Sequence, residues 1–134
     1  MQRTPADRAR RRHIASAASG GIQRAHVALY VCNPSGDTDR ILTDLRAYAA
    51  ARDWIVADEL VDNISISEPT DQRPQWAKLA QLIESGQVQG IVTPMRRMCG
   101  LRESEQTSLN TWLAAHHAFV VNVWGGNREL AAGA

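Results

Sequence analysis

The stretch His26-Val27-Ala28-Leu29-Tyr30-Val31-Cys32 decides the fold, because this short apolar run has the composition of a β-strand. A turn, Asn33-Pro34-Ser35-Gly36, follows it directly. Asp37 or Thr38 can then cap a helix, whose predicted apolar face consists of Ile41, Leu42, Leu45, Tyr48 and Ala49. Residues 26–49 therefore predict a first strand–helix unit.

The same alternation continues to residue 124. A second strand is predicted over residues 54–61, and a long polar loop over residues 62–72 follows it. The next helix has the clearest helical period in the chain. Pro74 suits its first turn, Gly86 ends it, and its apolar positions are Trp76, Leu79, Ala80 and Ile83.

A third strand is predicted over residues 88–93, followed by an irregular stretch over residues 94–102. The third helix has core spacing at Leu109, Trp112, Leu113 and His116, and a fourth strand covers residues 118–124. This order predicts an α/β fold over residues 26–126, with an open, mainly parallel sheet of about four to five strands and helices on both faces. Four tryptophans fall on predicted core positions, which favours packing over base stacking: Trp54, Trp76, Trp112 and Trp124.

Length and composition limit the possible classes of protein. The chain has 134 residues, 44% of them hydrophobic, which suits one domain that needs no disulfide or metal. Cys32 and Cys99 match no metal-binding spacing, so we expect no cofactor and no metal, and reduced thiols in a cytoplasmic protein. No stretch approaches the ~20 apolar residues that a membrane span requires, so we expect no membrane contact.

Charge is distributed unevenly along the chain. Residues 1–25 contain six arginines and one aspartate, a net charge of +5, whereas the remainder contains nine basic and thirteen acidic residues, a net charge of −4. Residues 1–25 are predicted to be a basic N-terminal arm with a short helix, and residues 127–134 a C-terminal tail. The arm is a candidate nucleic-acid contact through Arg8, Arg10, Arg11 and Arg12. Two alternatives are a solvated tail and docking of the arm on the acidic body.

The carboxyl ends of parallel strands meet at one edge of a sheet, where binding sites usually form. The loops at this edge are residues 33–37, 62–72 and 94–102. They carry or adjoin arginines that we expect to be unpaired and to form a phosphate-binding patch: Arg73, Arg96, Arg97 and Arg102. The alternative is a set of solvated surface charges.

Several segments, in this order and spacing, resemble the catalytic domain of serine recombinases (resolvases and invertases). They are Val27-Ala28-Leu29-Tyr30, Leu45-Arg46-Ala47-Tyr48-Ala49, Asp71-Gln72-Arg73-Pro74, Gly90-Ile91-Val92 and Gly100-Leu101-Arg102-Glu103. The resemblance covers most of residues 27–124. It implies a resolvase-like three-layer fold and, in an active member, attack of a serine hydroxyl on a DNA phosphodiester, with several arginines on the phosphate.

The resemblance also implies that the site is altered. The family's arginine before the nucleophile falls on Cys32, and the nucleophile falls on Pro34. A gap in the alignment would instead bring Ser35 to the nucleophile position. Arg73 matches a family arginine, Arg97 lies near the family's Asp-Arg pair without the aspartate, and the next arginine falls near Gly100, where Arg102 is a substitute.

Three hypotheses follow. The first is a degenerate recombinase-like domain that acts as a DNA-associated or protein-binding regulatory module, with a recombinase, another DNA-bound protein or a second copy as its partner. The second is an active recombinase or nicking domain that uses Ser35 with Arg73, Arg97 and Arg102. The third is a flavodoxin-like or receiver-like ligand-binding domain, which the sheet pattern alone suggests.

Overall fold

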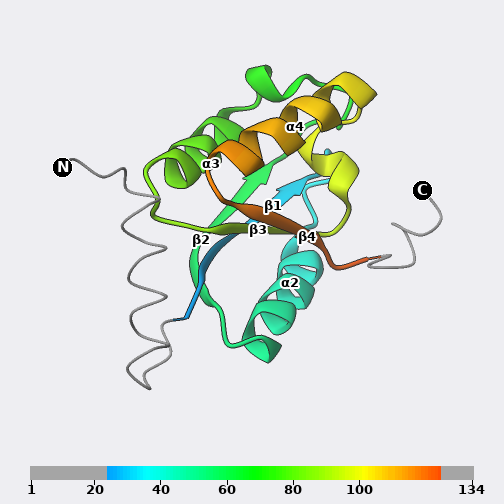
Figure 1. Ribbon diagram of the computed structural model, residues 1–134. Coiled ribbons are helices and arrows are strands. Elements are labelled where there is room, and N and C mark those ends of the chain that lie inside the picture. The colour runs from blue at the N-terminus through cyan, green and yellow to red at the C-terminus, as the bar shows by residue number, and fades with distance from the viewer. Residues whose placement is uncertain (1–23, 125–134) are drawn as a thin grey trace.

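A computed structural model describes residues 24–124 (Figure 1). The arginines of the predicted arm at positions 8–12 and the predicted tail over residues 127–134 lie outside this range. The elements, in chain order, are β1 (His26–Cys32), α2 (Asp39–Ala51), β2 (Ile55–Asp62), the 3-10 helix η1 (Thr70–Gln72), α3 (Pro74–Glu84), β3 (Gly90–Thr93), the 3-10 helix η2 (Arg96–Cys99), α4 (Glu103–Ala115) and β4 (Phe119–Asn122).

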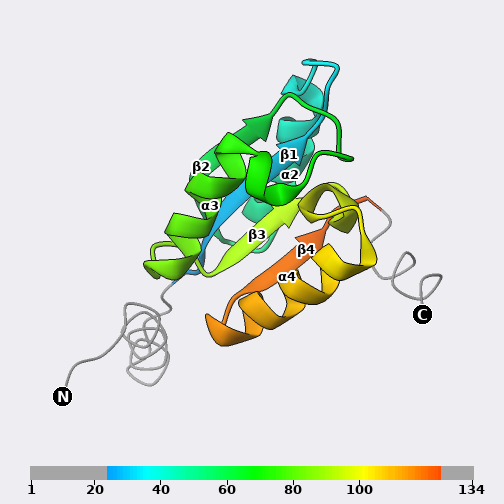
Figure 2. The same ribbon diagram turned by 90° about the horizontal axis from the view of Figure 1, so that it is seen from above.

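The described strands form one parallel sheet in the order β2-β1-β3-β4. α2 covers one face, and α3 and α4 lie side by side on the other (Figures 1 and 2). The predicted α/β fold, with an open parallel sheet between helices, is therefore confirmed. No helix within residues 24–124 is long and apolar enough to cross a membrane.

β1 is the centre of the core. It pairs with β2 on one side and β3 on the other, and the side chains from Val27 to Val31 are fully buried. A central strand with helices over both faces has no exposed side, which explains its unbroken apolar run.

The ends of the predicted elements differ in detail. β3 and β4 are each four residues long and shorter than predicted, because only these residues pair with a neighbouring strand. Trp124 follows β4 and is 40% exposed, so its assignment to the core was wrong. The polar loop and the irregular stretch each contain a short 3-10 helix, η1 and η2.

Gly90 provides space for an aromatic contact at the start of β3. Phe119 lies beside it on β4, and its ring packs against Trp54 with the ring centroids 5.1 Å apart. A Cβ atom at position 90 would overlap the Phe119 ring. A glycine is therefore needed here for close approach rather than for an unusual backbone angle.

We expect Gly90→Ala to lower the free energy of unfolding by about 1–3 kcal/mol, since the added methyl group must displace a packed ring. Urea unfolding would measure this change. Phe119→Ala removes the clashing ring, so the double variant should lose less stability than the sum of the two single variants. Strictly additive losses would contradict this account.

Candidate functional site

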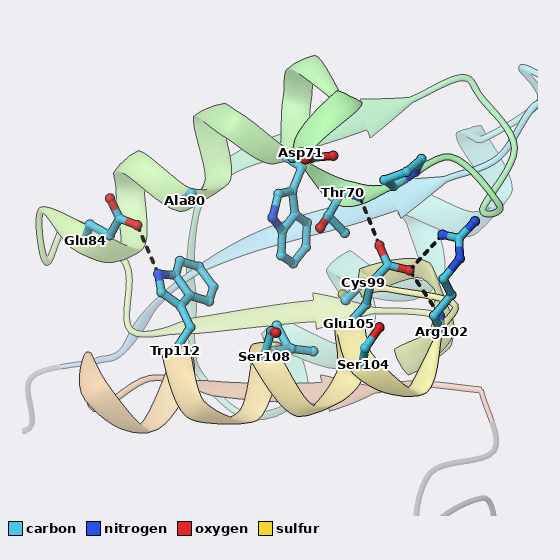
Figure 3. Close-up of a pocket in the computed structure, with 13 residues that line it drawn as sticks. Thr70, Asp71, Ala80, Glu84, Cys99, Arg102, Ser104, Glu105, Ser108 and Trp112 are labelled. Carbon is cyan, nitrogen blue, oxygen red and sulfur yellow. Dashed lines mark hydrogen bonds and ion pairs between the residues drawn. The ribbon is translucent and has the colours of Figure 1, made fainter.

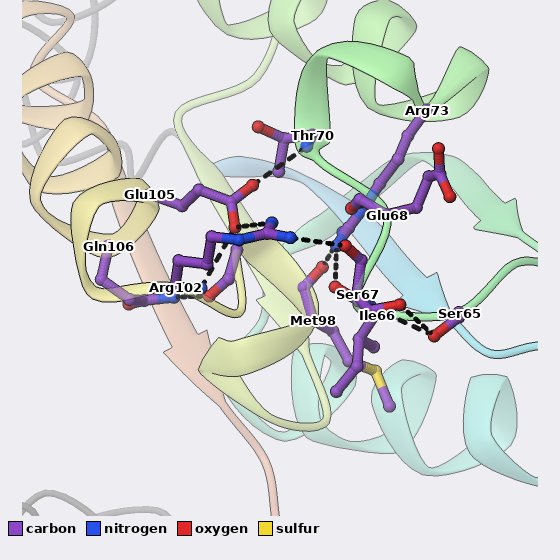
Figure 4. Close-up of polar contacts among 11 residues, drawn as sticks. Ser65, Ile66, Ser67, Glu68, Thr70, Arg73, Met98, Arg102, Glu105 and Gln106 are labelled. Atoms are coloured by element: carbon purple, nitrogen blue, oxygen red, sulfur yellow. Dashed lines mark hydrogen bonds and ion pairs between the residues drawn. The ribbon is translucent and has the colours of Figure 1, made fainter.

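Three loops meet at the carboxyl edge of the sheet, as predicted. They follow β1, β2 and β3, and Asn33 N donates to the Asp62 carbonyl at 2.9 Å where the first two leave the sheet. Figure 4 shows the loop after β2 lying against η2 and the start of α4. This edge holds all the residues predicted for a phosphate site.

Arg73 is enclosed at this edge rather than free. Its side chain is 1% exposed. Nε donates to the Glu68 carbonyl at 2.9 Å, and Nη2 donates to the Ile66 carbonyl at 2.9 Å. Nη1 donates to the Met98 carbonyl and, at 3.4 Å, to Tyr30 Oη. The guanidinium thus joins the loop after β2 to η2 and β1, and the prediction that Arg73 is unpaired was wrong.

Tyr30 connects this guanidinium to a buried carboxylate. Its hydroxyl donates to Asp62 Oδ2 at 2.8 Å. Burial raises the pKa of Tyr30 far above its usual value, with the hydrogen bond from Arg73 opposing this shift, so the phenol stays protonated and able to donate. Arg73 and Asp62, opposite charges that are both buried, are therefore joined through one phenol oxygen.

Asp62 also caps α3. Oδ1 accepts from Gln75 N at 3.0 Å, and Oδ2 accepts from Trp76 N at 3.1 Å. These are N–H groups of the first helical turn, which has no intrahelical acceptor for them. Sequence reasoning missed this role of Asp62. A clue is that position 73, directly before Pro74, holds no capping side chain, so the cap has to come from elsewhere.

Arg96 and Arg102 also have partners within the domain. Arg96 Nε donates to Gln106 Oε1 at 2.8 Å, and its Nη2 donates to Asn110 Oδ1. Arg102 Nη1 pairs with Glu105 at 3.3 Å, and its Nη2 donates to the Ser67 carbonyl at 3.3 Å (Figure 4). The expectation that these two arginines are unpaired was wrong, because α4 and the loop after β2 supply acceptors.

Glu105 links α4 to η1. Burial acts to raise its pKa, but hydrogen bonds from the backbone N–H groups of Arg102 and Thr70, and from the Arg102 guanidinium, outweigh this and lower the pKa. The carboxylate therefore stays ionised near neutral pH and holds the Arg102 side chain in place.

Arg97 differs from the other three. Its side chain is exposed, and its guanidinium forms no hydrogen bond or ion pair with any other group of residues 24–124. It is therefore the arginine of the predicted patch that is free to contact an added phosphate.

Ser35 lies in the exposed turn after β1. Its N–H donates to Asn33 Oδ1 at 3.1 Å, and its Oγ accepts from Asp37 N at 3.4 Å. Within the described part of the chain, no arginine bonds to it. Ser35 lies in a solvent-exposed turn, whereas Arg73 is buried among backbone carbonyl groups. The structure therefore does not bring the two side chains together.

Two of the positions that the resemblance gives to catalytic residues, those of the nucleophile and of the arginine before it, hold groups of other chemistry. Cys32 is 1% exposed and its Sγ donates to the Ile64 carbonyl at 3.3 Å, while Pro34 has no group that can attack phosphorus. Burial raises the pKa of the Cys32 thiol, and burial raises that of Cys99 to about 12, so both stay protonated. Residues 24–124 contain no group of three or more potential metal ligands.

A groove of about 600 Å³ lies between α3 and α4 (Figure 3). Its apolar lining includes Trp76, Ala80, Leu109 and Trp112, and its charged lining consists of Asp71, Glu84, Arg102 and Glu105. Three carboxylates and one guanidinium give a net charge of −2. Sequence reasoning assigned both tryptophans to the core and missed the groove. The spacing of Trp76, Ala80 and Glu84 at four-residue intervals was the available sign of a shared helix face.

Comparison with solved structures identifies the fold. The chain is similar to the C-terminal catalytic domain of ISC1926 TnpA, an IS607-like serine recombinase, with a TM-score of 0.65 and 20% identity over 81% of this chain and 76% of that one. It is also similar to the N-terminal catalytic domain of TP901-1 integrase, with a TM-score of 0.64 and 17% identity over 73% and 77% of the two chains. The chain has a serine recombinase catalytic-domain-like fold.

A third similar structure is the first ORF in transposon ISC1904 from Sulfolobus solfataricus P2, with a TM-score of 0.55 and 18% identity over 72% of this chain and 66% of that one. No protein-family model and no curated protein matches the chain. The likeness confirms the resemblance at the level of the recombinase-like fold. It does not extend to the reaction, which depends on individual side chains.

We expect Arg73→Met to lower the free energy of unfolding by about 3–5 kcal/mol, because it leaves buried acceptors and the Asp62 carboxylate without their cation. Arg97→Met is the matched control and should change it by about 0.5 kcal/mol or less, since it removes an exposed arginine that has no partner. Urea unfolding would measure the free energy of unfolding of both variants. Equal stability of the two variants would contradict a structural role for Arg73.

Proposed function

We propose that this chain is a recombinase-like module that acts at DNA by binding, without strand transfer through a phosphoserine. The observation that carries this proposal is the enclosure of Arg73. Four of the five N–H donors of Arg73 already bind carbonyl groups and a phenol, and the residue is 1% exposed, so a phosphate reaches it only if the loop opens.

The expected loss of strand-transfer rate supports this proposal. Removing one preorganised donor to a transition state typically costs roughly 100 to 1,000-fold in rate. The positions matched to the nucleophile and to the arginine before it hold Pro34 and Cys32, and Arg73 is occupied. Two missing donors alone would reduce strand transfer by about 10⁴-fold or more on this scale.

The proposed binding to DNA uses Arg97 and the arginines of the arm. Arg97 is exposed and unpaired, and the arm supplies Arg8, Arg10, Arg11 and Arg12. Phosphate contacts of this kind give affinity without sequence specificity. The groove between α3 and α4 has the opposite charge, so we place DNA at the arm and the carboxyl edge rather than there. A recombinase or another copy of the chain on the same DNA fits as the protein partner.

One observation favours a second candidate, an active recombinase or nicking domain. Ser35 lies at the carboxyl edge with its hydroxyl exposed, and Arg97 is free at the same edge. Activity would require the loop after β2 to release Arg73, and Arg102 to leave Glu105. Ser35, Arg73, Arg97 and Arg102 are the residues that this candidate would use.

A covalent-adduct assay separates these two candidates. The purified protein is incubated with supercoiled plasmid, denatured with detergent and tested for protein-linked DNA, with an active serine recombinase as positive control. We expect no adduct above background for the wild type or for Ser35→Ala. An adduct that the wild type forms and Ser35→Ala loses would establish the active candidate instead.

The salt dependence of duplex binding tests the proposed contacts. Replacing Arg10, Arg11 and Arg12 with alanine should reduce the slope of log K against log salt by about 0.9 per arginine, about 2.7 in total, since each phosphate contact releases counterions. Fluorescence anisotropy measures this slope. Arg46→Ala is the control and should leave it unchanged, because Arg46 pairs with Glu59 at 2.6 Å on β2. An unchanged slope in the triple variant would remove the arm from the DNA interface.

A further inference from the structure

The groove between α3 and α4 combines an aromatic floor with an acidic border. Trp76 and Trp112 line it with their ring centroids 6.1 Å apart, and each is only partly buried. Glu84 lies at one end, where its Oε2 accepts from Trp112 Nε1 at 3.0 Å, Arg102 and Glu105 lie at the other, and Asp71 lies on the border just before α3 (Figure 3). Flat indole faces next to carboxylates favour a guanidinium, which stacks on a ring and bonds to an acid.

The rest of α3 does not offset this charge. Its single lysine, Lys78, is exposed and does not line the groove. Arg102 lines the groove but is paired with Glu105. Asp71 and Glu84 are therefore both exposed and without a cationic partner among the described residues. The groove thus presents negative charge that an added cation can neutralise.

The chain contains a segment of the complementary charge. Residues 1–25 have a net charge of +5, and the arginines at positions 8, 10, 11 and 12 are the densest cationic run in the sequence. A segment of five residues with four arginines can present guanidinium groups to both free carboxylates of the groove, Asp71 and Glu84.

The point where the arm joins the domain suits this placement. Gln89 N donates to the His26 carbonyl at 2.8 Å, and His26 N donates to Gln89 Oε1 at 2.9 Å, so the start of β1 lies beside the segment that follows α3. Glu84 closes α3 five residues earlier, and Figure 2 shows this end of α3 on the side where the arm joins β1.

The arm is also long enough for its arginines to reach along the whole groove. An extended chain spans about 3.3–3.6 Å per residue, so the 12 residues from 13 to 24 reach about 40 Å at most. The 11 residues of α3 are about 16 Å long. Gly20-Gly21 allows the chain to reverse direction on the way.

We propose that the arginine run at positions 8–12 docks in the groove between α3 and α4 of the same chain, with guanidinium groups on the Trp76 and Trp112 rings and beside Asp71 and Glu84. The arm is then held by the domain when no other anion is present. A polyanion that binds these arginines must first displace them from the groove. This competition with DNA, unlike the docking itself, rests on the proposed function.

Paramagnetic broadening in the full chain tests the docking. A nitroxide is attached at Arg11→Cys, and the indole N–H signals of the four tryptophans are assigned by Trp→Phe variants. Cys32 and Cys99 are both about 1% exposed, and the unsubstituted chain treated with the same reagent controls for their labelling. We expect the Trp112 signal to lose at least about half its intensity at low salt. Trp54, which packs beside α2 on the opposite face of the sheet, should be unaffected.

Charge variants then test the acidic border. Asp71→Asn with Glu84→Gln should restore the Trp112 signal, whereas the matched pair Asp39→Asn with Asp44→Asn on α2 should not. Salt at 1 M should also restore it, because the Debye length falls to about 3 Å. Equal broadening of Trp54 and Trp112, or none, would overturn the proposal.

A mixed sample identifies the molecule that supplies the arm. Isotope-labelled chain without nitroxide is combined with unlabelled chain that carries it. Broadening of Trp112 in this mixture would show docking between two copies and would overturn docking within one chain. Adding duplex DNA to the doubly labelled chain should restore the Trp112 signal. A signal that stays broadened while DNA is bound would refute the competition but leave the docking intact.

Discussion

The buried guanidinium of Arg73 is the constraint on which the carboxyl edge of this sheet depends. Its donors bind the carbonyls of Glu68, Ile66 and Met98 and the hydroxyl of Tyr30, so it holds together segments from three parts of the chain. A buried charge is tolerated only when its hydrogen bonds are complete and an opposite charge is close. Asp62 supplies that charge through Tyr30. Among residues 24–124, no buried side-chain nitrogen or oxygen lacks a partner.

Arginine is suited to phosphate chemistry, but Arg73 has a structural role here. The same guanidinium geometry that recognises a phosphoryl group also fits a set of converging carbonyl oxygens. A loop that depends on such a cation cannot release it without exposing several acceptors at once. The serine recombinase-like fold is thus compatible with a site in which Arg97 is exposed while Arg73, Arg96 and Arg102 organise the loops around it.

The carboxyl edge and the groove between α3 and α4 differ in which charged side chains are free. The carboxyl edge presents Arg97 and the exposed Ser35 turn, whereas the groove between α3 and α4 has a net charge of −2 around two indole rings. A polyanion is repelled by the groove, because like charges repel. The basic residues 1–25, with a net charge of +5, are complementary in charge to the groove.

Much of the fold was determined by local sequence alone. Apolar runs, turn residues and helical periodicity depend on neighbours within a few positions, so they located β1, α2, α3 and α4 and the loops at the carboxyl edge. The partners of the arginines were not predictable in this way. Arg73 meets Met98, 25 positions away, and Tyr30, 43 positions away, while Asp62 caps a helix that begins at Pro74. Such contacts form only when the parallel sheet brings distant loops to one edge, and burial then decides whether a charge faces water or the interior. Sequence specified which groups are present, and tertiary structure decided which of them are still free to act.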